Sequence, residues 1–129
     1  AGNPDGHIIL RGGVKPNYDA DSINAALSEL DKLNLPHGIV VDCSHGNSNK
    51  DHNRQPAVAE AVLSQRLAGT EAIIGIMLES HLFGGRQNLT NGKAEHYGVS
   101  VTDACIDWPT TTELLASLHQ QMQRLVAAA

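Results

Sequence analysis

The most regular feature of this chain is a set of three short apolar runs, at residues 7–10, 38–41 and 72–78. None of them alternates apolar with polar positions, as a strand with one solvated face would. Unbroken runs rich in Ile and Val are typical of strands buried on both faces, as in parallel sheets. We therefore expect three interior strands in these runs.

Helical periodicity occupies the segments between and after these runs. The first predicted helix starts at a cap, Asp19 or Asp21, and ends near residue 33. The second spans about residues 55–67 and stops at Gly69, and the third begins at a cap among residues 110–112. The apolar stripes expected of the three helices are Ile23, Leu27 and Leu30; Val58, Ala61 and Val62; and Leu114, Leu118, Met122 and Leu125.

The predicted order of elements is strand, helix, strand, helix, strand, a long loop and a final helix. Two successive strand–helix–strand units imply a parallel sheet with right-handed crossovers, so the predicted fold class is α/β. The loop, at about residues 80–109, is longer than most connections in compact domains. Loops of this length are usually functional or disordered.

Composition narrows the class of protein. The chain has 129 residues, which suits one domain, and 3% aromatic residues, so its core has to rely on Leu, Ile, Val and Ala. A net charge of −5 argues against a general binder of nucleic acid or of anionic membranes. Because the sequence has no run of 18 apolar residues, no signal-peptide pattern and only two cysteines, we expect a cytoplasmic protein with reduced thiols.

Chemically versatile side chains follow each of the three apolar runs. Arg11 follows the first run, Asp42 and His45 follow the second, and Glu79 follows the third. Arg11, His45 and Glu79 are spaced 34 residues apart. Ligands of α/β barrels and doubly wound sheets bind at the carboxyl ends of the strands, so we expect these side chains to share one site.

These residue types suit a metal ion beside an anion. His, Glu and Asp side chains supply one nitrogen and several oxygens to a divalent metal, and an Arg guanidinium fits a phosphate or carboxylate. Gly12 and Gly13, directly after Arg11, would let an anion approach the backbone. Asp42 is a candidate for orienting a metal-binding side chain. The combination suggests a phosphorylated substrate that carries a carbonyl group.

Each of these residues also has a simpler interpretation. His45 fits a hydrogen-bonded turn, Glu79 fits a salt bridge to a helix, and Arg11 fits a solvated surface. Cys43 and His45 are two positions apart and invite a Cys–His metal pair, but we interpret Cys43 as a small buried thiol. His81, close to Glu79 in sequence, fits either a structural or a functional interpretation.

Four sequence motifs together resemble a known family. HIILRGG, VDCSHGNSNKD, IMLESHL and SVTDACIDW resemble, in the same order, the C-terminal part of the type I 3-deoxy-D-arabino-heptulosonate 7-phosphate (DAHP) synthases. The resemblance implies a (β/α)8 TIM barrel and the aldol-type condensation of phosphoenolpyruvate with erythrose 4-phosphate, the first step of the shikimate pathway to aromatic amino acids. It also implies a divalent metal of the Mn, Fe, Co or Zn class.

The resemblance assigns roles to individual residues. Arg11 of LRGG would bind the phosphate of phosphoenolpyruvate, and His45, Glu79 and Asp103 would bind the metal, with His45 also catalytic. Asp103 lies in the long loop, where periodicity does not single it out. The metal would act as a Lewis acid on the aldehyde oxygen of erythrose 4-phosphate, while carbon 3 of phosphoenolpyruvate attacks the aldehyde carbon.

The chain departs from the family in what it lacks. The family's Cys-Ala-Gly-Pro stretch, which holds a fourth metal ligand, and its Lys-Pro-Arg-Thr segment, which binds the aldehyde substrate, do not occur in the sequence. We thus expect residues 1–129 to form about the last three βα units of a barrel and to be inactive alone. Two alternatives remain: a 3-deoxy-octulosonate 8-phosphate synthase-like enzyme, and a non-catalytic half-barrel assembly module.

Part of a barrel also predicts self-association. Three strands taken from a closed barrel leave two open sheet edges, which can pair with another chain. They also leave an inner apolar face, on or near which we place Ile8, Val40, Ile74 and Ile76. The chain is therefore expected to form a homo-oligomer.

Overall fold

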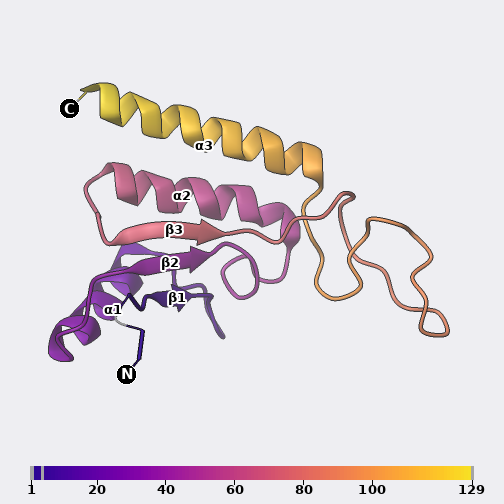
Figure 1. Cartoon of the computed structure of the whole chain (residues 1–129), viewed down its shortest axis with the longest axis horizontal. Helices are drawn as coiled ribbons and strands as arrows, with labels where there is room; N and C mark the ends of the chain where they lie inside the picture. Colours follow the sequence, from indigo (N-terminus) through magenta and orange to yellow (C-terminus); the bar gives the residue numbers. More distant parts are fainter. Residues whose placement is uncertain (1, 4, 129) are drawn as a thin grey trace.

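The computed structural model describes residues 2–3 and 5–128, with side chains as far as residue 123. Within these residues the chain forms a three-stranded parallel sheet in the order β1-β2-β3, and a helix follows each strand (Figure 1). The elements are β1 (Ile8–Leu10), α1 (Ala20–Lys32), β2 (Ile39–Asp42), the short 3-10 helix η1 (His52–Arg54), α2 (Gln55–Leu67), β3 (Ile73–Met77) and α3 (Trp108–Ala128). The predicted order and the parallel α/β sheet are confirmed.

The register of the sheet brings the carboxyl ends of the three strands to one edge. The last residue of β1, Leu10, pairs with Val41 of β2, and the last residue of β2, Asp42, pairs with Met77 of β3. The segments that leave the three strands therefore start side by side. The polar residues that follow the three strands therefore lie at one edge of the sheet, as predicted from their positions after the apolar runs.

The hydrophobic core lies between the helices and one face of the sheet. A single buried cluster joins Ile23 of α1, Val58 of α2 and Leu114 of α3 to Ile39 and Val41 of the central strand. Figure 1 shows α2 beside β3 and α3 as the next layer out. The apolar stripes of the helices are thus buried against β2 and its neighbours, which fixes the strand ends in place.

The opposite face of the sheet is uncovered in the described part of the chain. This agrees with the predicted bare inner face that includes Ile74, and not with the burial on both faces that the strand pattern alone predicted. Ile9, Ile74 and Met77 are 47%, 60% and 43% exposed. The prediction that Ile8 and Ile76 lie on this uncovered face is also wrong, because both pack against the core on the helix side. An apolar run shows which residues suit an interior but does not show whether both faces have a covering layer.

The helix boundaries follow local hydrogen bonding. Of the two candidate caps for α1, Asp19 is the one used, since its Oδ1 accepts a hydrogen bond from the Ser22 backbone N at 2.9 Å. α2 has the expected bounds and is followed by Gly69, whose φ of +108° suits glycine. α3 begins at Trp108 and not among residues 110–112, because Asp107 caps it through the Thr110 backbone N at 2.8 Å.

The predicted helix stripes agree with the burial of the described side chains. In α2 the fully buried alanine is Ala59, whereas Ala61 is half-buried. The side chain of Leu125 lies outside the described residues. The remaining predicted stripe residues are buried or half-buried, namely Ile23, Leu27, Leu30, Val58, Val62, Leu114, Leu118 and Met122.

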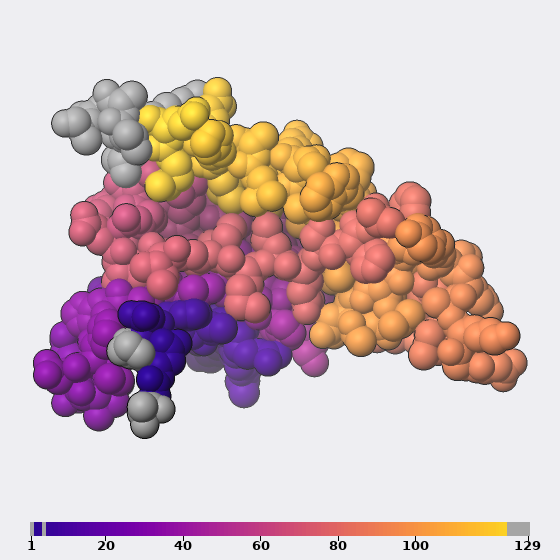
Figure 2. Space-filling view, viewed as in Figure 1, coloured from indigo at the N-terminus to yellow at the C-terminus, as the bar shows by residue number. Residues whose placement is uncertain are grey.

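The long connection between β3 and α3 folds back toward the sheet. Its two ends run together, with a bridge between Ser80 and Ile106 and another between Gly85 and Cys105. Ile106 is buried in the core and anchors the returning segment. The outer part of the loop forms a lobe beyond the sheet, shown in orange tones at the right of Figure 2. The returning segment passes the carboxyl end of β3, and it carries Asp103.

The described helices include none that could span a bilayer, since none joins sufficient length to sufficient apolar character.

Candidate metal centre

The end of β2 holds a buried network of polar side chains. Asp42 is the last residue of the strand and is 3% exposed. Its Oδ1 accepts hydrogen bonds from the Ser44 backbone N at 2.8 Å and from the Ser44 hydroxyl at 2.6 Å. Its Oδ2 lies 2.7 Å from Nδ1 of His45. A buried carboxylate needs such partners, and here they fix its orientation.

His45 is oriented by this network. A carboxylate oxygen only accepts, so Nδ1 of His45 carries the hydrogen and donates it to Asp42. In the neutral ring Nε2 then carries the lone pair, and this is the form of imidazole that binds metals. The backbone of His45 has a left-handed φ of +46°, which turns the chain sharply after the strand. The orienting role of Asp42 stays a prediction, for which these hydrogen bonds give a structural basis.

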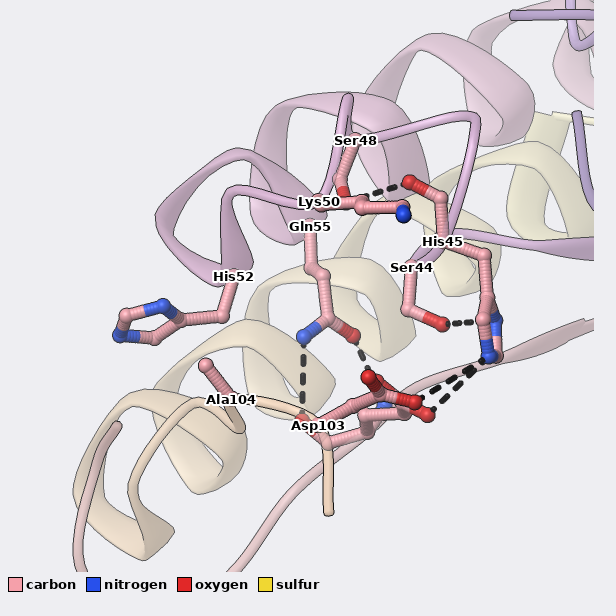
Figure 3. A pocket seen from close by; sticks show the side chains of 9 residues that line it. Ser44, His45, Ser48, Lys50, His52, Gln55, Asp103 and Ala104 are labelled. Carbon is pink, nitrogen blue, oxygen red and sulfur yellow. Dashed lines mark hydrogen bonds and ion pairs between the residues drawn. The ribbon is translucent and has the colours of Figure 1, made fainter. Parts of the chain in front are cut away.

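Glu79 and Asp103 face Nε2 of His45 from two other segments. Oε1 of Glu79, two residues past the end of β3, is 3.4 Å from Nε2, and Oδ2 of Asp103, from the returning loop, is 3.8 Å from it. One ligand atom from each residue lies within 4.8 Å of the other two. Figure 3 shows the side chains of His45 and Asp103 pointing toward one another across the pocket.

The electrostatics of this group suit a cation. Burial raises the pKa of the Glu79 carboxyl, and the neighbouring carboxylates of Asp103 and Asp42 act in the same direction, whereas His45 and Arg11 oppose them. Two carboxylate oxygens and an imidazole lone pair, all acceptors, converge on one point. A divalent ion would satisfy all three at once, and a nitrogen with two oxygens is a donor set that Mn, Fe, Co and Zn accept.

The pocket at this point has a volume of about 50 Å³. Its walls come from the turn after β2, the start of α2, the end of β3 and the returning loop. It is lined by Ser44, His45, Ser48, Lys50, His52, Gln55, Glu79, Asp103 and Ala104. Asp103 is the most open of the three acidic residues around His45, with 66% of its side chain exposed.

Arg11 lies at the same edge of the sheet but outside the walls of this pocket. Its backbone is tied to the neighbouring turn, since the Gly46 backbone N donates to the Arg11 carbonyl oxygen at 3.1 Å. Its side chain is exposed, and its charge lowers the pKa of Glu79 slightly against the effect of burial. Arg11 therefore stands beside the candidate metal centre, where it is free to meet an anion.

Two residues that the sequence did not single out hold these segments together. Asn47 is fully buried, and its Nδ2 donates to the carbonyl oxygens of Leu10 and Asp42 at 3.0 and 2.8 Å, which joins β1 to β2. Gln55 is fully buried and bonds to the backbone of Glu79. In the sequence, Asn47 and Gln55 are simply polar residues close to a strand end and a helix start. Such residues are common in turns and at helix starts, so no specific signal in the sequence pointed to them.

Cys43 and His81, which the sequence left as candidates, lie outside the cluster. Cys43 is fully buried, as predicted, and burial together with the Asp42 charge raises the pKa of its thiol to about 12. A thiol in this state is a poor metal ligand and a poor nucleophile. His81 is exposed, and its Nδ1 accepts a hydrogen bond from the Leu82 backbone N at 2.9 Å.

Comparisons with known proteins agree on one family. The family model described as the DAHP synthetase I family matches residues 1–116. A Tyr-sensitive phospho-2-dehydro-3-deoxyheptonate aldolase of Enterobacter agglomerans is 50% identical over 98% of this chain and 60% of its own length. Its counterpart from Escherichia coli (strain K12) is 49% identical over 98% of this chain and 36% of its own length.

A solved structure gives the same result for the fold. The phospho-2-dehydro-3-deoxyheptonate aldolase of Francisella tularensis SCHU S4 superposes with a TM-score of 0.87 and 39% identity. The match covers 95% of this chain and 36% of that one. The chain thus spans between about a third and three fifths of the length of the relatives named here.

Proposed function

Since this chain belongs to the DAHP synthetase I family, a family of aldolases, we propose that it provides the metal-binding and phosphate-binding strands of a DAHP synthase. Such an enzyme condenses phosphoenolpyruvate with erythrose 4-phosphate and water to DAHP and phosphate, at the entry to aromatic amino acid biosynthesis. The observation that carries the proposal is the convergence of His45, Glu79 and Asp103 at the carboxyl edge of the sheet.

We propose further that residues 1–129 are about the last three βα units of a (β/α)8 barrel. Three parallel strands with their helices on one face are what such a segment would contain, and Ile9, Ile74 and Met77 on the uncovered face would line the barrel interior. Coverage of 36% of the Francisella tularensis chain supports this, since three of eight units are a similar share. Completion of the barrel would cover the sheet edges and this apolar face.

His45, Glu79 and Asp103 would hold the divalent metal of the site, of the Mn, Fe, Co or Zn class. When bound, the metal supplies Lewis-acid polarisation of the aldehyde oxygen of erythrose 4-phosphate. Asp42 would hold the hydrogen of the neutral His45 ring on Nδ1, which leaves the lone pair of Nε2 directed at this point. This control of the tautomer is the contribution of His45 to catalysis that the geometry supports.

Arg11 would bind the phosphate of phosphoenolpyruvate. Its guanidinium is at the edge of the site and exposed, and it offers a planar fork that matches a phosphate. The bond from the Gly46 backbone N to its carbonyl oxygen ties the Arg11 backbone to the turn that carries His45, so the phosphate would be held beside the metal centre. In this arrangement phosphoenolpyruvate would be oriented by the loop after β1, and erythrose 4-phosphate would be activated at the metal centre.

The relatives named above favour this reaction over the octulosonate alternative, since each of them is a heptonate aldolase. No observation favours a purely non-catalytic assembly module. We also propose a cytoplasmic homo-oligomer, on the basis of the free thiols of Cys43 and Cys105 and of the uncovered sheet face.

A complementation assay tests the proposed function. The 129-residue chain is mixed with the complementary part of the Escherichia coli (strain K12) relative, of which it matches 36%, and loss of phosphoenolpyruvate and release of phosphate are followed with erythrose 4-phosphate and Mn²⁺. We expect no turnover from the chain alone and turnover from the mixture, lost when the mixture contains His45→Ala. Turnover of roughly 1–10³ per second by the chain alone would contradict its expected inactivity. Equal turnover with His45→Ala would contradict the site.

A further inference from the structure

Gln55 is a polar residue in an unusual place. It is the first residue of α2 and is fully buried, and it forms part of the wall of the pocket. Burial of an amide is unfavourable unless its oxygen and nitrogen find partners. In Figure 3 its side chain points from the helix toward the acidic side of the pocket.

Both partners of Gln55 belong to the backbone of Glu79. Nε2 of Gln55 donates to the Glu79 carbonyl oxygen at 3.0 Å, and the Glu79 backbone N donates to Oε1 of Gln55 at 2.8 Å. The side-chain amide of Gln55 thus makes the two hydrogen bonds with Glu79 that the backbone of a neighbouring strand would otherwise make. This pair of bonds joins α2 to a residue 24 positions away in sequence.

Glu79 needs such support because the sheet no longer holds it. The ladder between β2 and β3 closes with the bond from the Cys43 backbone N to the Met77 carbonyl oxygen at 2.9 Å. Beyond this bond, the described backbone contact of Glu79 is a bond from the Ile106 backbone N to its carbonyl oxygen at 3.0 Å. That contact ties the carbonyl oxygen of Glu79 to the returning loop, whereas Gln55 ties both its carbonyl oxygen and its backbone N to α2.

We propose that Gln55 is the positioning residue of Glu79, which holds the carboxylate in reach of Nε2 of His45. This inference rests on the proposed metal centre and extends it to a residue outside the ligand set. Loss of the clamp would let the backbone of Glu79 move, and the 3.4 Å separation of its carboxylate from His45 would widen. Replacement of residues that orient metal ligands typically lowers metal affinity by about 10- to 100-fold.

The test is a Mn²⁺ titration of the 129-residue chain, with Gln55→Met as the variant that keeps the shape of the side chain and removes both hydrogen bonds. Gln65→Met is the matched control, because Gln65 lies on the same helix and its Nε2 donates to a backbone carbonyl, that of Tyr18, at 2.8 Å. We expect Mn²⁺ affinity to fall about tenfold or more in Gln55→Met and to stay unchanged in Gln65→Met. Unchanged affinity in Gln55→Met would overturn the inference.

A double-mutant cycle separates positioning from general stability. If Gln55 acts through Glu79, then Gln55→Met should weaken Mn²⁺ binding no further once Glu79→Gln is present, whereas independent effects would add. Additive loss would overturn the inference. Wild-type affinity in Glu79→Gln would instead show that Glu79 is not a ligand, and both the proposed centre and this inference would fail. Should Gln55→Met not fold, Gln55→Asn, which keeps the amide but not its reach, takes its place with the same expected and contradicting results.

Discussion

The backbone N of Gly46 donates a hydrogen bond to the carbonyl oxygen of Arg11 at 3.1 Å, and this contact joins the loop after β1 to the turn after β2. The two backbones meet closely around it. A Cβ on Gly12 would lie 2.6 Å from the Asn47 backbone N, and one on Gly46 would lie 2.7 Å from the carbonyl carbon of Gly12. Glycine at both positions is therefore what lets the phosphate-binding candidate approach the metal-binding candidate, His45.

Replacement of Gly46 by alanine should separate these two loops. A new Cβ would meet backbone atoms that cannot move independently, so Gly46→Ala should lower the free energy of unfolding by more than about 1 kcal/mol. Gly13→Ala is the control, since nothing lies within 4 Å of a Cβ there, and its effect should stay within about 0.5 kcal/mol. Urea denaturation measures both changes, and equal effects of the two substitutions would contradict the close-approach argument.

Asp42→Asn should weaken metal binding through the tautomer of His45. If the amide oxygen keeps the two bonds from Ser44, the amide nitrogen faces Nδ1 of His45 and donates to it. The ring proton then moves to Nε2, toward Glu79 and Asp103, where it blocks a metal. We expect Mn²⁺ affinity to fall about 10- to 100-fold by calorimetry.

Asp31→Asn is the control for this substitution. Asp31 also pairs with a histidine, His37, at 2.7 Å, but both side chains are exposed and neither lines the pocket. This variant should bind Mn²⁺ like the wild type. Retention of full affinity by Asp42→Asn would contradict the orienting role of Asp42.

The thiol of Cys43 should make the stability of the chain depend on alkaline pH. The pKa is raised from 9.0 to about 12 in the folded chain, so between these values the folded state keeps a proton that the unfolded state has lost. The free energy of unfolding contributed by Cys43 is therefore constant below pH 9 and declines as the pH rises from 9 toward 12. Denaturation of wild type and Cys43→Ala across this range should show a shallower decline in the variant. Parallel pH profiles would count against the burial of this thiol.

The uncovered sheet face should drive self-association of the 129-residue chain. Ile9, Ile74 and Met77 form an exposed apolar group beside two open sheet edges, and such surfaces are usually covered in soluble proteins. We expect sedimentation velocity to show a species larger than the monomer, and Ile74→Lys to shift it toward the monomer. Leu115→Lys, at an exposed position of α3, should leave the species unchanged. A concentration-independent wild-type monomer would be incompatible with this account.

The parallel sheet and most of the candidate site could be predicted from the sequence, because the apolar runs mark the strands and the polar residues after them mark the strand ends. Arg11, His45 and Glu79 each come shortly after an apolar run, and a parallel sheet brings such positions to one edge whatever the intervening helices contain. The same logic explains why Asp42 could be proposed as an orienting residue, since it precedes His45 by three positions on the same strand end.

The residues that periodicity did not find owe their positions to long-range contacts. Asp103 reaches the site because the loop that carries it returns past Glu79, and only the motif resemblance indicated this. Gln55 and Asn47 act through hydrogen bonds to backbone groups distant in sequence, which leave no repeat in the chain. The strand pattern could not show which face lacks a covering layer, because Ile9 and Ile74 are apolar in either case, and the bare inner face was predicted only from the resemblance to part of a barrel.

The central claim is that His45, Glu79 and Asp103 form one divalent-metal centre, and calorimetric titration of the chain with Mn²⁺ tests it most directly. The wild type should bind one ion with modest affinity, and His45→Ala should abolish binding, because Nε2 of His45 is the one nitrogen in the group and faces both carboxylates. His81→Ala, an exposed histidine next in sequence to this site, should bind as the wild type does. Mn²⁺ binding of the same affinity in His45→Ala and in the wild type would contradict the account.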